Sequence, residues 1–153
     1  MTNNAAVIWC IIPCRKGAVT HHMAKTKQIT AWAESTPGVI GRIGKAFADA
    51  KINITAFTAY GTGGESPIRM QVSSPVKAKK ILQDLGYRTT EEEVLRLTVS
   101  DKPGVLGEIG KRLGDAHVNA DYAYATVAKG AKKVDVVIGV SDLVGATKAL
   151  RGL

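Results

Sequence analysis

Two segments of the chain carry β-rich, partly alternating residues of the kind that forms half-buried strands. They are residues 29–33 (Ile-Thr-Ala-Trp-Ala) and residues 94–99 (Val-Leu-Arg-Leu-Thr-Val). Apolar residues at helical spacing follow each of them: Ile40, Ile43, Phe47 and Ala50 in one place, and Leu106, Ile109, Leu113 and Ala116 in the other. The pattern therefore predicts a strand and then a helix, twice.

After each predicted helix the pattern returns to that of strands. Strands are expected over residues 52–60 and 67–73, and again over 118–128 and 132–140, with glycine-containing turns between them. Second helices are expected to start at residues 74 and 141, and a further strand within residues 87–92. The later half has no obvious fourth strand. The edge that this leaves invites pairing with another chain or with the N-terminal residues.

The two halves also repeat in sequence, with an offset of 66 residues. Between residues 37–59 and residues 103–125, 11 of 23 positions are identical. A period of this length indicates a duplicated small domain and not a solenoid. The order βαββαβ predicts an α+β, ferredoxin-like sandwich in each copy, with an antiparallel sheet and both helices on one face. We place the copies at residues 23–92 and 93–153.

Residues 1–22 stand apart from this pattern. The apolar run over residues 5–12 is far shorter than the ~20 residues that a membrane span needs. Basic residues follow this run, whereas a signal peptide usually has them in front. We expect residues 1–22 to be an extension that is disordered or upstream of the true start, with Met23 as a plausible start. We expect a cytoplasmic protein with no membrane contact.

Composition excludes several functions. The chain is 45% hydrophobic and 22% charged, which is typical of a globular protein. Its net charge of +8 is spread along the chain, as expected of a solvated surface. Cys10 and Cys14 have neither redox nor zinc spacing, and no nucleophile stands beside a base. We therefore expect no metal, no cofactor and no catalytic residues, and hence no enzyme.

Several glycines lie within or just before the predicted first helix of each copy. Gly41 and Gly44, like Gly107 and Gly110, lie on one helix face, where close packing within or between the copies would explain them. Gly38 and Gly104 lie at the first helical turn, where free N–H groups and the helix dipole favour an anion. A plain turn-and-cap role would explain Gly38 and Gly104 equally well.

The repeated motif resembles the signature of the ACT domain family. Residues 101–109 (Asp-Lys-Pro-Gly-Val-Leu-Gly-Glu-Ile), followed by residues 116–121 (Ala-His-Val-Asn-Ala-Asp), are similar to its x-P-G-V-L loop, helix and A-x-I/V-N strand start. Residues 35–40 with residues 50–54 are similar in the first copy. The resemblance covers about residues 26–151. The layout is similar to that of stand-alone tandem ACT proteins of bacteria and archaea.

The resemblance implies a regulatory amino-acid site between two ACT units. The loop after the first strand of one unit faces the start of the second strand of its neighbour. The implied residues are Asp101, Gly104, Val105 and Leu106 facing Asn53 and Ile54, and Ser35, Gly38, Val39 and Ile40 facing Asn119 and Ala120. Helix capping by Asp101 and turn chemistry at the two asparagines are the alternatives. Ser35 replaces the acidic or amide residue of the family, so the first site is expected to be weaker, altered or absent.

We therefore expect a regulatory protein that senses an amino acid, forms a homodimer and acts by ligand-dependent packing of ACT units. One alternative is a regulatory subunit that acts in trans on an amino-acid biosynthetic enzyme, as small subunits of acetolactate synthase do. Another is a nucleic-acid-binding protein. Five aromatic residues lie on predicted strands, Trp32, Phe57, Tyr60, Tyr122 and Tyr124. The aromatic pattern of RNA-recognition sheets is absent, so nucleic acid is not an expected partner.

Overall fold

The computed structural model describes residues 22–61, 63–126 and 131–153 as an α+β fold with one antiparallel sheet and four helices. The elements of the first half are β1 (His22–Glu34), α1 (Val39–Asp49), β2 (Ile54–Ala59), β3 (Glu65–Val72) and α2 (Pro75–Asp84). Those of the second half are β4 (Arg88–Ser100), α3 (Val105–Asp115), β5 (Ala120–Thr126), β6 (Lys133–Val140) and α4 (Leu143–Ala149). The element order repeats, as the periodicity predicted.

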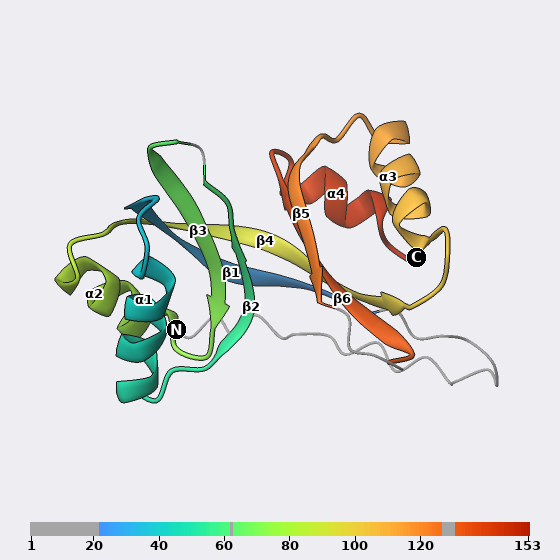
Figure 1. The fold of residues 1–153 in the computed structure, drawn as a ribbon. Coiled ribbons are helices and arrows are strands. Elements are labelled where there is room, and N and C mark those ends of the chain that lie inside the picture. Colours follow the sequence, from blue (N-terminus) through green and yellow to red (C-terminus); the bar gives the residue numbers. More distant parts are fainter. Residues whose placement is uncertain (1–21, 62, 127–130) are drawn as a thin grey trace, which may run out of the picture.

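All six strands belong to a single sheet in the order β2-β3-β1-β4-β6-β5. The two central strands, β1 and β4, have 13 residues each and pair antiparallel (Figure 1). Lys27 lies opposite Glu93, its counterpart at the offset of 66 residues. Because equivalent residues pair antiparallel at this point, an approximate two-fold axis passes through it and relates the two halves.

This arrangement differs from the expected pair of separate four-stranded sheets. The predicted strands at 87–92 and 94–99 are one continuous strand, β4, so the expected boundary at 92/93 lies inside a strand. The first part of β1 pairs with the second part of β4, from His22 with Thr98 to Lys27 with Glu93. The N-terminal part of β1 therefore supplies the fourth strand that the second half lacked, and His22 belongs to the sheet. The remainder of the expected extension, residues 1–21, lies outside the described residues.

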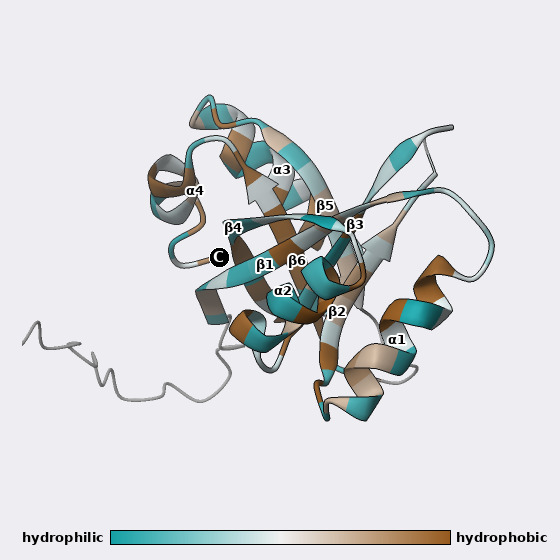
Figure 2. Ribbon diagram, turned by 90° about the vertical axis from the view of Figure 1, so that its left-hand side faces the viewer, coloured by the Kyte–Doolittle hydropathy of each residue, from teal (hydrophilic) through white to brown (hydrophobic). Residues whose placement is uncertain are grey.

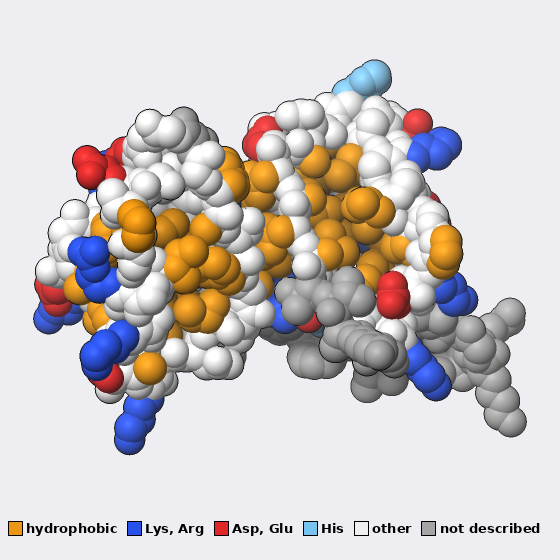
Figure 3. All heavy atoms as spheres, viewed as in Figure 1, with side chains coloured by type: hydrophobic (Ala, Val, Ile, Leu, Met, Phe, Trp, Pro, Cys, Tyr) orange, Lys and Arg blue, Asp and Glu red, His pale blue; other side chains and the backbone are white. Residues whose placement is uncertain are grey.

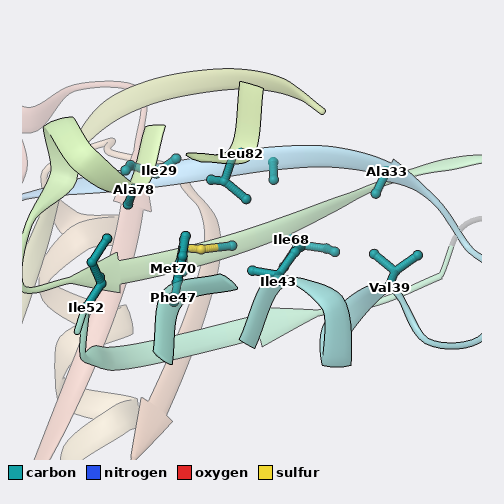
Figure 4. Close-up of a cluster of buried hydrophobic side chains, with 11 residues drawn as sticks. Ile29, Ala33, Val39, Ile43, Phe47, Ile52, Ile68, Met70, Ala78 and Leu82 are labelled. Carbon is teal, nitrogen blue, oxygen red and sulfur yellow. The ribbon is translucent and has the colours of Figure 1, made fainter. Parts of the chain in front are cut away.

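The helices of each half cover an apolar cluster on the same face of the sheet. In the first half, Ile29, Ala31 and Ala33 of β1 pack against α1 and α2 (Figure 4), and Leu95, Leu97 and Val99 of β4 pack against α3 and α4 in the second. The apolar and polar sides of these elements can be followed in Figure 2. Ile43, Phe47, Ile109 and Leu113 are buried as predicted, whereas Ile40 and Leu106 are 55% and 67% exposed.

Each first helix begins two residues after a proline. Gly38 and Gly104 are the N-cap residues, with φ of 90° and 94°. A glycine adopts this left-handed conformation without steric cost, which explains its presence there. Pro37 and Pro103 therefore lie in the preceding turn, and not at the first helical position. Lys51 and His117, which are equivalent, also share a positive φ of 56° and 55°.

The glycines inside α1 and α3 do not serve close packing within the described part of the chain. A Cβ atom added to Gly41, Gly44, Gly107 or Gly110 would meet nothing within 4 Å. The expectation of tight packing within the chain is therefore not met. These glycine faces are open to solvent or to another chain.

The face of the sheet that carries no helices is concave and encloses a partly buried interior. Arg69 of β3 lies 4.2 Å from the ring centroid of Tyr122 on β5. These strands are four positions apart in the sheet, which would be about 19 Å if it were flat. Ala56 of β2 joins Val94 and Val137 in a third apolar cluster on this side. The sheet must therefore be strongly curved, bringing its two ends toward each other.

Gln28 stands at the centre of this interior and is 0% exposed. Its Nε2 donates to Glu92 Oε1 at 2.9 Å and to Tyr122 Oη at 2.6 Å. Its Oε1 accepts from Tyr124 Oη at 2.7 Å. Because Gln28 lies on β1 and both tyrosines lie on β5, these hydrogen bonds tie the two halves together. Paired in this way, a buried amide is tolerated in an otherwise apolar region.

Because the pKa values of Tyr122 and Tyr124 are raised in the folded protein, we predict that the protein loses stability at high pH. Burial raises the pKa of Tyr124 to about 12. Burial, followed by the Glu92 carboxylate, also raises the pKa of Tyr122. An unfolded tyrosine ionises near pH 10, so the folded state alone keeps these protons above that pH. The stabilisation that comes from keeping Tyr122 and Tyr124 protonated is therefore fully present below about pH 10 and is lost as the pH rises toward 12.

We expect urea unfolding to report this loss, and the Tyr124→Phe variant to lose less stability than the wild type over the same interval. Tyrosinate absorbance provides an independent measurement. If all four tyrosines of the chain titrate together near their ordinary pKa, the interior described above is not closed.

Candidate functional site

The two predicted binding loops lie at opposite ends of the molecule. Residues 35–38 follow the end of β1 at Glu34, and residues 101–104 follow the end of β4 at Ser100. Because β1 and β4 are antiparallel, their C-terminal ends point away from each other (Figure 1).

The predicted site residues at the starts of β2 and β5 lie near the middle of the sheet instead. Ile54 pairs with Val72, two residues beyond the Met70–Ile29 pair, and is therefore level with Lys27. Ala120 pairs with Val140 and is level with Glu93 by the same reasoning. Each loop is thus seven residues of strand, roughly 23 Å, away from this level.

The single chain therefore does not bring the predicted partners together. Asp101, Gly104, Val105 and Leu106 do not face Asn53 and Ile54, nor do Ser35, Gly38, Val39 and Ile40 face Asn119 and Ala120. The physical reason is that β1 and β4 pair antiparallel, which places each loop at an outer end of the strands and both strand starts near their middle.

Of the two asparagines, Asn119 uses its side chain in a local contact of the kind found in turns, whereas the contact of Asn53 is made by its backbone N–H to a residue 20 positions away. The Asn53 N–H donates to Ser73 Oγ at 3.0 Å, and Asn119 Nδ2 donates to Asp121 Oδ1 at 3.1 Å. Both residues are exposed.

Neither first helix is capped by a side chain. Gly38 and Gly104 have none, and no side-chain oxygen within the described ranges accepts from the first turn of α1 or α3. Asp101 is exposed and does not cap α3, so that alternative is not met. The first-turn N–H groups and the positive end of the helix dipole favour an anion at both positions.

A small cavity adjoins the uncapped end of α1. This loop cavity has a volume of about 150 Å³ and lies between the loop before α1 and the end of β2. The predicted residues Ser35, Val39 and Ile40 line it, together with Ala59 and Tyr60. Neither Asn119 nor Ala120 does. The first loop thus meets the β2–β3 turn of its own half.

A larger cleft lies at the same end of the molecule. This end cleft has a volume of about 940 Å³ and is open to solvent. Its walls come from the end of β1, the first turn of α1, the β2–β3 turn and the residues before β4. Trp32, Glu34, Arg42, Glu65 and Tyr87 line it.

Sequence reasoning missed Trp32, Glu34, Arg42 and Tyr87 as site residues. The motif drew attention to the loop, whereas these four residues come from elements that only the fold brings together. One local signal was available, because an acidic residue, Glu34, directly precedes Ser35.

The described ranges give no support for metal binding, a membrane-spanning helix or an aromatic surface for nucleic acid. No three His, Cys, Asp or Glu side chains are grouped there to hold a metal ion, and Cys10 and Cys14 lie outside these ranges. None of the four helices has the length and hydropathy to cross a bilayer. Tyr122 and Tyr124 point into the interior and bond Gln28, so they do not form an exposed stacking platform.

Comparison with known structures finds the same fold in several solved proteins. Protein BT0572 from Bacteroides thetaiotaomicron superimposes with a TM-score of 0.76 at 23% identity, over 84% of this chain and 88% of that one. The ligand-free regulatory subunit of aspartate kinase from Thermus thermophilus gives 0.63 at 16%, over 86% and 95%. That of Thermus flavus gives 0.61 at 10%, over 84% and 93%. At these identities the likeness is one of fold.

The sequence itself matches no curated protein. It does match the ACT domain family over residues 27–85, from within β1 to the residue after α2. This range contains the first predicted binding loop, the loop cavity and most of the end cleft. The resemblance predicted from the sequence is confirmed over these residues, which match the ACT domain family.

Proposed function

We propose that this chain is a regulatory protein that binds a free amino acid at the loop before α1. The observation that carries the proposal is the loop cavity, which adjoins the uncapped end of α1 inside the ACT domain. The free N–H groups of the first turn suit a carboxylate. Apolar residues on the opposite wall, such as Ala59 and Ile68, suit the carbon atoms of a small ligand.

The second half is proposed to be a second ACT unit. Its helix α3 begins and ends 66 residues after α1, and its N-cap glycine has the same left-handed conformation. Irregular pairing near the start of β2 recurs at the start of β5. The chain would then present two loops of the same design, one at each end.

We further propose that the chain works as a homodimer. Since one chain keeps each loop apart from the strand start of the other half, a second chain would have to supply the facing strand. Exposed Ile40 and Leu106 and the open glycine faces of α1 and α3 are available for such contacts. Figure 3 shows hydrophobic side chains gathered over both halves on one side of the molecule. Ligand binding at this contact would favour one packing over another, which a partner could recognise.

A thermal-shift measurement with each of the twenty amino acids tests the proposal. We expect at least one to raise the melting temperature, because a ligand at 100 times its dissociation constant stabilises a protein by about 2.7 kcal/mol. Ser35→Trp should abolish that shift by filling the loop cavity. The matched control is Val76→Trp on α2, at a position that is 82% exposed and outside both loops, which should retain it. The proposal fails if no amino acid produces a shift.

A second candidate function is regulation of a separate enzyme in trans. It is favoured by the likeness to the regulatory subunit of aspartate kinase, of which 95% is covered by this chain. An assay of aspartate kinase activity with and without added chain, in the presence of the amino acid found above, distinguishes it from a free-standing sensor.

A further inference from the structure

The end cleft contains two opposite charges that the protein leaves unpaired. Glu34 is the last residue of β1, and Arg42 lies in the first turn of α1. Both line the cleft, and neither side chain forms a hydrogen bond or an ion pair with any described residue. An exposed charge commonly has no partner, but here a carboxylate and a guanidinium border the same hollow without neutralising each other.

The surroundings of Glu34 increase its need for a cation. Glu34 pairs directly with Glu65 on β3, and like charges opposite each other destabilise a sheet. Glu65 has its own cation, since Arg88 Nη2 lies 2.6 Å from its Oε2. Arg88 is also held over the Trp32 ring, 4.6 Å from the centroid. Glu34 is therefore the carboxylate of this pair that still lacks a positive partner.

Two residues of the cleft wall carry a buried polar atom without a hydrogen-bond partner among the described residues. Trp32 Nε1 and Tyr87 Oη belong to lining residues, are buried, and have no hydrogen-bond partner among the described residues. The aromatic and apolar part of the wall consists of the Trp32 and Tyr87 rings, Ala33 and Val39. Such a wall accommodates a side chain beside the charged groups.

The second half lacks this arrangement. Ser100 replaces Glu34 and is 5% exposed, and Glu108 replaces Arg42 and pairs with Arg112 at 2.8 Å. Leu153 stands in the place of Tyr87. The charges of the cleft are thus a property of the first half only, although the backbone of the two halves repeats.

We propose that the end cleft binds a zwitterionic α-amino acid, with the carboxylate on Arg42, the ammonium on Glu34 and the side chain beside Trp32 and Tyr87. A guanidinium holds a carboxylate through charge-assisted hydrogen bonds, and a carboxylate holds an ammonium in the same way. The inference rests on the proposed function, whose loop cavity shares Glu34, Ser35 and Val39 with the end cleft. It places the amino acid in the cleft, makes Arg42 the group that holds the carboxylate, and adds an asymmetry between the halves. The first loop, expected to be the weaker because of Ser35, is then the binding one, because Glu34 provides the acidic group one position earlier.

Trp32 provides a direct signal for binding in the cleft. The chain has two tryptophans, so Trp9→Phe leaves Trp32 as the single fluorophore. In this background we expect one or more of the twenty amino acids to change the fluorescence of Trp32. Glu34→Gln and Arg42→Gln should each weaken binding of that amino acid about 10- to 100-fold. Glu108→Gln, the counterpart of Arg42→Gln in the second half, should leave the affinity unchanged.

Ligands that lack one charge assign the two roles. Arg42→Gln should not alter the affinity for the amine that remains when the carboxylate of the amino acid is removed. Glu34→Gln should not alter the affinity for the acid that remains when the ammonium is removed. A purely structural effect of either substitution would weaken both derivatives alike, and that result would overturn the inference.

The outcomes separate this inference from the proposed function. If an amino acid raises the melting temperature but its affinity is unchanged in both variants, the ligand binds elsewhere and the inference is refuted while the function stands. If no amino acid changes either the melting temperature or the fluorescence, both are refuted.

Discussion

Phe47→Ala is expected to lower the free energy of unfolding by about 3–5 kcal/mol, the cost of removing a large aromatic side chain from a packed core. Phe47 is 1% exposed and lies among the buried residues beneath α1 (Figure 4). Its counterpart in the second half, Leu113, is 3% exposed, and Leu113→Ala should cost about 2–5 kcal/mol. Val76→Ala, at a position that is 82% exposed, is the control and should change stability by about 0.5 kcal/mol or less.

The form of the transition matters as much as its midpoint. Since β1 and β4 each contribute to both halves, neither half can lose its sheet while the other keeps a complete one. Urea unfolding followed by circular dichroism and by tryptophan fluorescence should therefore give one coincident transition in both variants. Two separate transitions in Phe47→Ala would mean that the halves fold independently, in conflict with the shared strands.

Gln28→Leu is expected to lower the free energy of unfolding by about 2–4 kcal/mol, although leucine fills a similar volume. The substitution leaves the hydroxyl group of Tyr124 without its partner and removes the Gln28 donor from Tyr122 Oη and from Glu92 Oε1. An unsatisfied buried polar group costs about 1–3 kcal/mol. Both tyrosines are partly buried, so water compensates for part of this cost. Gln83→Leu on the exposed side of α2 is the control and should have little effect.

A double-mutant cycle isolates the contribution of the network. In a chain that already carries Tyr122→Phe and Tyr124→Phe, Gln28→Leu should cost much less, because replacing both partners of a buried hydrogen bond by apolar groups is nearly neutral. Equal cost in both backgrounds would mean that Gln28 acts only through the volume of its side chain. Chemical denaturation at neutral pH measures all four corners of the cycle.

The helices and turns were predictable because their signals are local. Second helices were expected to start at residues 74 and 141, and α2 and α4 begin at Pro75 and Leu143. Asp142 accepts from the N–H groups of Val144 and Gly145 at the start of α4. The periodicity of α1 and α3 predicted the buried residues Ile43, Phe47, Ile109 and Leu113. It erred at Ile40 and Leu106, because nothing in the described ranges covers the side of the helix on which they lie.

The strands were predictable as segments but not as a sheet. Periodicity identified residues 87–92 and 94–99 as strands, yet no local pattern reports that they continue into each other as β4. The same is true of the first residues of β1, whose partners lie about 70 residues away in sequence. Their pairing decides that the halves share one sheet, and hence that the two predicted loops lie far apart.

One part of the candidate site was likewise predictable from local sequence, and another part was not. The loop, its left-handed glycine and its uncapped helix end follow from a short motif, since each depends on residues within one turn of one another. The end cleft does not, because Glu34, Arg42 and Tyr87 come from three elements that meet only after β1 has paired with β3 and β4.

By itself, the amino-acid sequence determined the order of the elements, the duplication and the apolar sides of the helices, because propensity and periodicity act over a few residues. Only the tertiary structure decided the β1–β4 register, the curvature that buries Gln28 beneath Tyr122 and Tyr124, and the meeting of opposite charges in the end cleft. These features depend on pairing between distant strands, whose free energy arises from contacts across the whole sheet and leaves no signature in any single segment.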